Sequence, residues 1–559
     1  MRKGCQLSAV SFQLLALAIA TNAHAIEFRL WDQPLRVGIV ESFYASYHGD
    51  LGPGLISETD ANGMPTTSPR FVDIQSRLNV DLGWRRFRAF TRFDTAAYPD
   101  RPAGSCGPDA TTPVNLRSRF CQNPFYVEKW GIEYNGRTVE AVLGDFYVSF
   151  GRGMVLSIRK VDELGIDTTL RGGKLVYHED RIAATLVLGV TNMQNVDEAT
   201  GRTVRDYPPE STFLRPVPAP RDFIGGARAE YRFYDRVNVG LHEVGGIQAI
   251  DSTPNVQRHD SFFLYGGSVD APKLLRWLGL YFEGAGQLQT LSDARHAGYA
   301  LYGALNGYFG NVTLQLEVKD YVQYQPWKAS VPGGFVEFAP VQYLSPPTAE
   351  RVLTELQAPI FDVRGPRLRA DWRINDRLLV YASYAYFEDR SVPTSPLSFH
   401  DPYGGAELRW NRGQSHFFPS GGYRLEWDET LHAEHQHVGH IEWDGTQVLP
   451  RGLSIETQGF VLIRNEPLLM VPPWTEGNAY VALKWTPYLV ATLGYEWTTL
   501  RSNAATHNYF NGALQWNITT ASSVRVFAGG TRGGLKCISG VCRVFPPFTG
   551  ARLELVVRL

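Results

Sequence analysis

The chain contains 559 residues and carries a formal net charge of −2. Because this balance provides no basic field for a phosphate backbone, no nucleic-acid partner is expected. Beyond the N-terminal region, no stretch reaches the ~18 consecutive apolar residues of a transmembrane helix. No linker or change of composition divides the chain into the several soluble domains that its length would suggest.

The first 25 residues have the pattern of a secretory signal peptide. Arg2 and Lys3 precede a mostly apolar stretch over 9–20, and small residues flank His24 at the expected cleavage site. The apolar stretch is too short to span a bilayer as a helix. We therefore expect residues 1–25 to be a signal peptide and residues 26–559 to form one exported domain.

Strict alternation of apolar and polar residues recurs along the rest of the chain, for example over 312–319, 367–373, 489–498 and 509–518. This is the period of β-strands with one apolar and one polar face. Many such stretches run for about 10 to 13 residues, long enough to cross a bilayer when tilted. Strands of soluble sandwiches are usually nearer 5 or 6 residues.

The connections between these stretches alternate between short and long. Tight turns are expected at 135–136, 178–181 and 374–376, and long connections at 97–123 and 325–364. Outer-membrane barrels have short periplasmic turns and long extracellular loops. The sequence thus predicts an all-β fold, a single large antiparallel transmembrane β-barrel of about 24 strands (22 to 26), embedded in the lipid of a bacterial outer membrane.

Two features resemble known outer-membrane barrels. The final strand-like stretch, FTGARLELVVRL, resembles their C-terminal assembly signal, although those more often end in Phe. The combination of GDFYVSFGRGMVLS, LGIDTTLRGGKL and YLSPPTAE is similar to a group of poorly characterised bacterial outer-membrane proteins. The residues that match their motifs are Gly144, Phe146, Tyr147, Phe150, Gly151, Gly153, Leu164, Gly165, Ile166, Asp167, Arg171 and Gly172. This resemblance implies an outer-membrane barrel and brings no established substrate.

A barrel of this size generally needs something inside it. Strand-like sequence begins at Arg36 and Val37, about ten residues after the expected cleavage site. This leaves no room for a separate plug domain, so we expect inward-folded loops, a partner protein or both to fill the lumen. The candidate loops are 151–173, 192–220 and 325–364.

The first of these loops follows a strand-like stretch in which Phe146, Val148 and Phe150 are expected to face lipid. Gly151 and Gly153 then permit a bend, and we expect it to turn the chain into the lumen with 154–158 packed inside. The alternative is an ordinary extracellular loop whose glycines serve only the turn.

Charged residues at the narrowest point are the candidate site. From the loop we expect a constriction formed by Arg152, Arg159, Lys160, Asp162, Glu163, Asp167 and Arg171. The arginine-rich stretch RLRADWR adds Arg367, Arg369 and Asp371 as lumen-lining residues that could attract anionic solutes. The alternative is a solvated lumen wall without a specific binding role.

Four cysteines follow residue 25. In an exported chain an even number favours disulfides, here Cys106 with Cys121 and Cys537 with Cys542, since each pair closes a short loop. Metal binding is less favoured because no histidine accompanies either pair at ligand spacing. The histidines of LHAEHQHVGH fit a polar or interfacial strand surface better than a metal site. No cofactor is expected.

No catalytic constellation is recognisable. The chain lacks Gly-x-Ser-x-Gly and His-Glu-x-x-His, and nothing places a nucleophile beside a base. The favoured interpretation is a porin-like channel, not an enzyme, through which small hydrophilic solutes pass passively. The alternative is a structural or partner-binding barrel of an export or electron-transfer assembly, with a periplasmic or lumen-filling protein partner.

Overall fold

The computed structural model describes most of the chain after residue 25, and the predicted signal peptide lies outside the described part. The described residues are 26–49, 58–59, 65–66, 71–97, 125–192, 194, 222–234, 236–250, 258–291, 294–324, 362–390, 392, 394–469, 471–500, 508–538, 541–545 and 547–559.

Nearly all described elements are β-strands. Their bounds are β1 Ile26–Leu30, β2 Gln33–His48, β3 Glu58–Thr59, β4 Pro65–Thr66, β5 Phe71–Trp84, β6 Phe87–Ala97, β7 Phe125–Asn135, β8 Val139–Phe146, β9 Val148–Phe150, β10 Leu156–Ile158, β11 Lys160–Val161, β12 Ile166–Asp167, β13 Thr169–His178, β14 Ile182–Asn192, β15 Phe223–Phe233, β16 Val237–Ile250, β17 Arg258–Leu275, β18 Leu278–Leu291, β19 Ala294–Phe309, β20 Val312–Val322, β21 Val363–Asn375, β22 Leu378–Asp389, β23 Leu397–Trp410, β24 Ser415–Asp428, β25 Ala433–Val448, β26 Leu453–Glu466, β27 Val471–Trp485, β28 Leu489–Thr498, β29 Asn508–Asn517, β30 Ser522–Thr531, β31 Gly534–Ile538, β32 Val541–Phe545 and β33 Phe548–Arg558. Short 3₁₀ turns are η2 Asp162–Leu164, η4 Asn411–Gly413, η5 Pro450–Gly452 and η6 Pro467–Leu469.

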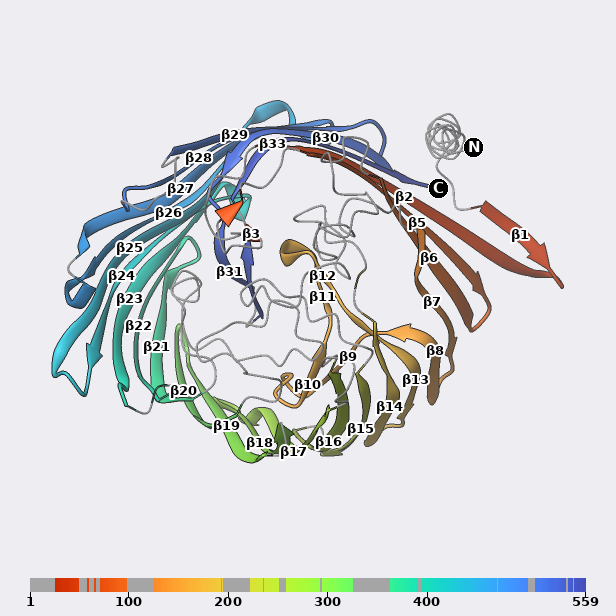
Figure 1. Cartoon of the computed structure of the whole chain (residues 1–559), viewed down its shortest axis with the longest axis horizontal. Coiled ribbons are helices and arrows are strands. Elements are labelled where there is room, and N and C mark those ends of the chain that lie inside the picture. Colours follow the sequence, from red (N-terminus) through yellow and green to blue (C-terminus); the bar gives the residue numbers. More distant parts are fainter. Residues whose placement is uncertain are drawn as a thin grey trace.

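Twenty-four of these strands close into one antiparallel barrel (Figure 1). Each strand pairs with its neighbour along the wall, and the ring closes where β2 pairs with β33, from Val40 opposite Arg558 to His48 opposite Gly550. The predicted fold class and strand number are confirmed. Among the described residues, no helix has the length and apolar character needed to cross a membrane.

The two faces of the wall differ as they do in barrels that contact lipid. Outward positions carry large apolar side chains that remain exposed, such as Leu241, Leu493 and Phe510. Inward positions carry polar and charged side chains, many of them covered, such as Glu317 and Lys319. A soluble protein would bury its apolar residues instead, so this pattern is that of a barrel with an apolar outer band.

One segment leaves the wall and lies inside the ring. β8 ends at Phe146 and β13 begins at Thr169, yet these two strands pair directly in the wall. Residues 147–168, here called the luminal segment, are therefore an excursion between neighbouring wall strands. β9 pairs with β10 and β11 with β12, and all four lie within the barrel in Figure 1.

The lipid-facing orientation expected for the strand end is wrong. Phe146 lies on the inner face of β8, opposite Leu170, and is 4% exposed. Val148 and Phe150 are no longer in the wall, and both are buried. The physical reason is that this part of the lumen wall is itself apolar, so an alternating pattern fits the inside as well as the outside.

Candidate functional site: the luminal segment

The luminal segment begins with a turn made by two glycines. Gly151 and Gly153 have φ values of 57° and 90°, which glycine adopts without the cost that other residues incur. The Gly153 amide donates to the Phe150 carbonyl at 2.8 Å. A Cβ at Gly151 would lie 2.4 Å from a carboxylate oxygen of Glu283 on β18. The turn thus rests directly on the wall.

Arg152 fastens this turn to two neighbouring wall strands. Its backbone amide donates to the Glu283 carboxylate at 2.9 Å, and its guanidinium lies 3.9 Å from the ring centre of Tyr281. One guanidinium nitrogen donates to the Tyr302 hydroxyl at 3.3 Å. The Tyr281 hydroxyl also donates to Glu283. Glu283, Tyr281 and Tyr302 are here called the Glu283 clamp.

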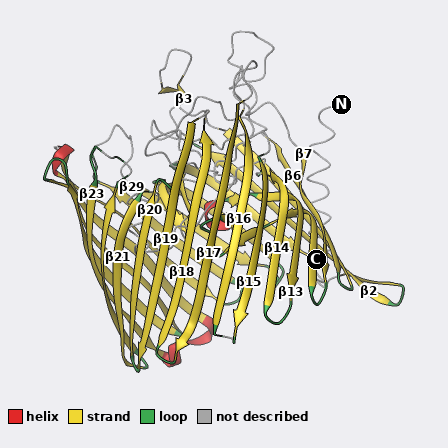
Figure 2. Ribbon diagram, turned by 90° about the horizontal axis from the view of Figure 1, so that it is seen from below, coloured by secondary structure: helices red, strands yellow, loops and turns green. Residues whose placement is uncertain are grey.

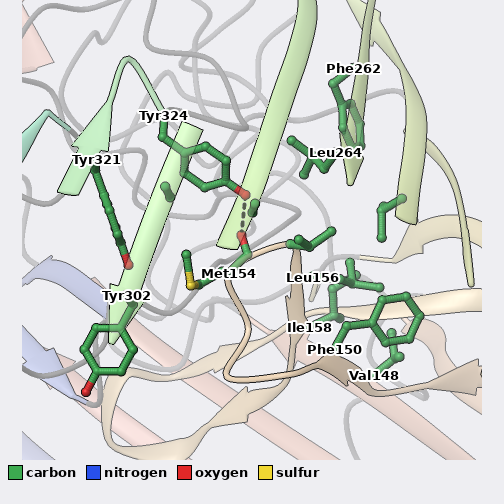
Figure 3. Close-up of a cluster of buried hydrophobic side chains, with 14 of the residues drawn as sticks. Val148, Phe150, Met154, Leu156, Ile158, Phe262, Leu264, Tyr302, Tyr321 and Tyr324 are labelled. Atoms are coloured by element: carbon green, nitrogen blue, oxygen red, sulfur yellow. Dashed lines mark hydrogen bonds between the residues drawn. The ribbon is translucent and has the colours of Figure 1, made fainter. Parts of the chain in front are cut away.

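Beyond the turn, the segment packs on an apolar region of the inner wall (Figure 3). Phe150, Met154, Leu156 and Ile158 are at most 1% exposed. The Tyr324 hydroxyl donates to the Met154 carbonyl at 2.9 Å. The wall residues of this apolar bed include Val187, Ile224, Val244, Phe262, Leu264, Ala285 and Ala300.

Small wall residues make room for these side chains. A Cβ added at Gly226 would lie 3.2 Å from the ring of Phe150. We did not predict the apolar bed from the sequence, although the residue pattern of two wall strands indicates it. β14 and β16 carry apolar or small residues on both faces, as in LVLGV and VGGI, where a wall facing water would alternate.

The far end of the luminal segment is fixed by buried charges. Asp167 accepts hydrogen bonds from Arg92, Lys129 and the Tyr147 hydroxyl. Asp167 is 2% exposed. Burial acts to raise the pKa of its carboxyl, but the charges of Lys129 and Arg92 outweigh burial and hold that pKa below its usual range. Asp167 with these three partners is here called the Asp167 clamp.

Between the clamps, η2 exposes charge to the lumen. Lys160 and Asp162 form an ion pair with side chains 44% and 73% exposed. The turn ends at Gly165, whose φ is 62° and whose amide donates to the Asp162 carbonyl at 3.0 Å. Gln194 donates to the Gly165 carbonyl at 2.8 Å. β31 lies beside η2, and Figure 1 shows it inside the ring.

The predicted site residues therefore fall into different places. Arg152 and Asp167 belong to the clamps, Lys160 and Asp162 are exposed, and Arg159 is partly buried. Glu163 lies within η2.

Arg171 is not among the lumen side chains. It shares a strand face with the exposed Leu175 and Tyr177 and binds Asp145 at 2.9 Å on the outer side of the wall. Placing it in the constriction was wrong, because β13 has already rejoined the wall and alternates again.

The arginine-rich stretch on β21 does face inward. Arg367 donates to Glu317 at 3.1 Å, and Glu317 also accepts from the Tyr302 hydroxyl. Arg367 is thereby linked to Arg152 through the Glu283 clamp. Further along, Arg369 binds Asp371 at 2.8 Å and lies 4.1 Å from the ring centre of Tyr381.

The cysteine pairs are only partly covered by the structure. Cys106 and Cys121 lie outside the described residues. Cys537 and Cys542 stand opposite each other in the register of β31 and β32, and the disulfides stay predictions. In the described part of the chain, no group of three or more His, Cys, Asp or Glu residues is placed to hold a metal ion.

Comparisons with known proteins report a likeness of fold. No family model and no curated protein matches the sequence. The siderophore receptor PirA from Pseudomonas aeruginosa aligns with a TM-score of 0.45 and 8% identity, over 94% of this chain and 80% of that one. A BenF-like porin from Pseudomonas fluorescens Pf-5 aligns with a TM-score of 0.35 and 11% identity, over 72% and 96%. The P pilus usher PapC gives a TM-score of 0.38 and 7% identity, over 93% and 99%.

Proposed function

We propose that this protein is an outer-membrane channel for the passive passage of small hydrophilic solutes, and that the luminal segment narrows its lumen. The observation that carries the proposal is the attachment of that segment inside a closed barrel. Two polar clamps and the apolar bed hold it against β6, β7 and β14–β20. A segment held on one side of a wide barrel reduces the lumen without having to fill it.

The wall away from these contacts supports a hydrated path. A cavity of about 820 Å³ lies where the inner faces of β29, β30 and β33 meet the short turns at 487–488 and 518–521. Its lining includes Gln515, Asn517, Arg525, Glu554 and Arg558. Amide and charged side chains of this kind keep water along a channel wall.

Within the luminal segment, we assign the constriction to Lys160 and Asp162. Both are exposed, and they lie between the two clamps. Arg152 and Asp167 contribute by holding the segment in place, since their charged groups are engaged by the wall. A charged pair at the narrowest point would favour polar solutes over apolar ones.

Conductance in planar lipid bilayers tests this function. The purified barrel should form discrete open channels, and replacing 150–166 by a short Gly-Ser linker should increase the single-channel conductance. The replacement leaves the wall pairing of β8 with β13 in place. A folded barrel that never conducts would contradict the proposal, and an unchanged conductance after the replacement would contradict the role of the segment.

A further inference from the structure

The hairpin formed by β1 and the start of β2 lies outside the closed ring (Figures 1 and 2). Among the described strands β1 pairs only with β2, from Ile26 opposite Val37 to Leu30 opposite Gln33. The ring is completed by β33, which pairs higher on the same edge of β2. The barrel therefore closes without β1, and the hairpin needs another explanation.

The two faces of the hairpin have different chemistry. Strand alternation and register place on one face the apolar residues Ile26, Phe28, Leu30, Leu35 and Val37. The opposite face carries Glu27, Arg29 and Arg36, and Arg36 Nε lies 3.1 Å from Glu27 Oε1. Phe28 remains 56% exposed, so nothing in the described chain covers the apolar face fully.

The apolar face continues the outer surface of the barrel. Leu35 stands opposite Trp84 and Val37 opposite Leu82 on β5, and register partners share a face of the sheet. Leu82 is itself an exposed outward residue. The apolar outer surface of the barrel thus extends onto the hairpin, with Gln33 opposite Leu30 as the polar residue of this face beside the tip.

The tip of the hairpin joins an aromatic belt. Trp31 is 75% exposed, and its ring lies 5.6 Å from that of Trp84. Outward aromatic contacts continue to Phe87 at 6.4 Å and from there to Tyr134 at 5.2 Å. Trp and Tyr rings gather in this way where a barrel meets the headgroups.

The backbone at the tip is unusual for its side chain. Trp31 has a φ of 48°, a left-handed conformation that bulky residues rarely adopt. Asn and Gly are the usual residues of such two-residue turns. Such a backbone outlier motivates a functional hypothesis for the Trp31 side chain, which its exposure and its contact with Trp84 make specific.

We propose that this N-terminal hairpin is a membrane-interface anchor in the periplasmic leaflet of the outer membrane. Its apolar face contacts acyl chains, Trp31 lies among the headgroups, and the charged face meets water. The hairpin adjoins the short turn at 85–86, and short turns face the periplasm in such barrels. The outer edge of β1 pairs with no described strand, and unpaired backbone groups do not enter hydrocarbon. That edge limits the hairpin to the interface.

Photo-crosslinking in lipid nanodiscs tests the anchor. The substitution Phe28→p-benzoylphenylalanine places a photoreactive probe on the apolar face. The matched control, Glu27→p-benzoylphenylalanine, places it one residue away on the other face. After illumination, intact-mass spectrometry should detect phospholipid adducts when the probe is at position 28 and no such adducts when it is at position 27. Leu30 and Arg29 provide a second pair with the same expectation.

If the apolar face of the hairpin contacts protein instead of lipid, the crosslinked products are different. An adduct between two copies of the chain at position 28, or an adduct with a different protein, would overturn the proposal, as would equal lipid labelling on both faces. Channel conductance is measured on the same samples, so that failure of the anchor is distinguished from failure of the channel.

Discussion

At Gly151 the backbone of the luminal segment passes directly against a wall carboxylate. Two constraints favour glycine at position 151. Its φ is positive, and the Glu283 carboxylate occupies the place where a Cβ would lie. In the sequence the charged residues nearby are the more conspicuous feature. The close approach to Glu283, however, is possible only because Gly151 has no Cβ.

The change Gly151→Ala should loosen the luminal segment. The left-handed backbone alone costs a non-glycine residue about 1–2 kcal/mol, and the new Cβ would displace the carboxylate that holds Arg152. Hydrogen-exchange mass spectrometry should show faster exchange over 148–168. Gly173→Ala is the control, because a Cβ there meets no atom within 4 Å. Equal exchange in the two variants would contradict the explanation.

Asp167→Asn should release the other end of the segment. Removing one partner from a buried ion pair typically costs about 3–5 kcal/mol, and Lys129 would keep its charge without this carboxylate. Limited proteolysis should then cut within 159–167. Asp162→Asn, in an exposed ion pair, should leave the pattern of cleavage unchanged.

Lowering the pH should release the same end of the luminal segment as Asp167→Asn does. The pKa of Asp167 is lowered in the folded protein, so its contribution is present above the ordinary aspartate pKa and is lost as the pH falls through the folded value. Segment release that begins only at alkaline pH would point to a different group.

Among the elements, β31 and β32 form a small hairpin that reaches the luminal segment at η2. Arg532, just before β31, donates through its backbone to Glu496 at 2.8 Å and forms an ion pair with Glu476. The base of this hairpin is therefore attached to the wall at β27 and β28.

A disulfide between Cys537 and Cys542 would hold the same hairpin together. Directly opposed residues of an antiparallel pair have Cα atoms about 4.5–5.5 Å apart, within the range that a disulfide spans. Peptide mapping without reduction should recover these two cysteines in one linked product. Alkylation of both in the unreduced, unfolded protein, or a link from either to Cys106, would refute the local pairing.

Strand prediction worked where one face met water and the other met lipid. The stretch 312–319 lies within β20, and 509–518 corresponds closely to β29. It failed where the inside is apolar, as at Phe150, because alternation alone cannot distinguish lipid from an apolar bed. Arg171 shows the converse, a charged residue on the outer face satisfied by Asp145. Which wall strand a loop packs on depends on distant residues such as Glu283 and Tyr324, whose pairing no local pattern reveals.

At the scale of the whole molecule, inward charges are largely matched by neighbours of opposite sign. Arg228 binds Glu230 at 2.7 Å, Arg409 binds Glu407 at 2.9 Å, and Lys484 pairs with Glu456. Such pairs produce little net potential along a lumen.

Ion selectivity should accordingly be weak. In a salt gradient across a planar bilayer, the reversal potential should correspond to a cation-to-anion permeability ratio within about a factor of two of unity. Glu456→Gln should shift that ratio toward anions, since Lys484 would lose its partner. A strongly selective wild-type channel would show that a few unmatched charges dominate the path.

The pairing of β2 with β33 also has a consequence for how the molecule is made. The strands that complete the ring are roughly 500 residues apart in the chain, and contacts at such separation form slowly because a long loop must first be closed. Until then both strands present free edges that can pair with other chains. Closure is thus expected to be the last and slowest step of assembly, and the unclosed intermediate is the species most exposed to aggregation and degradation.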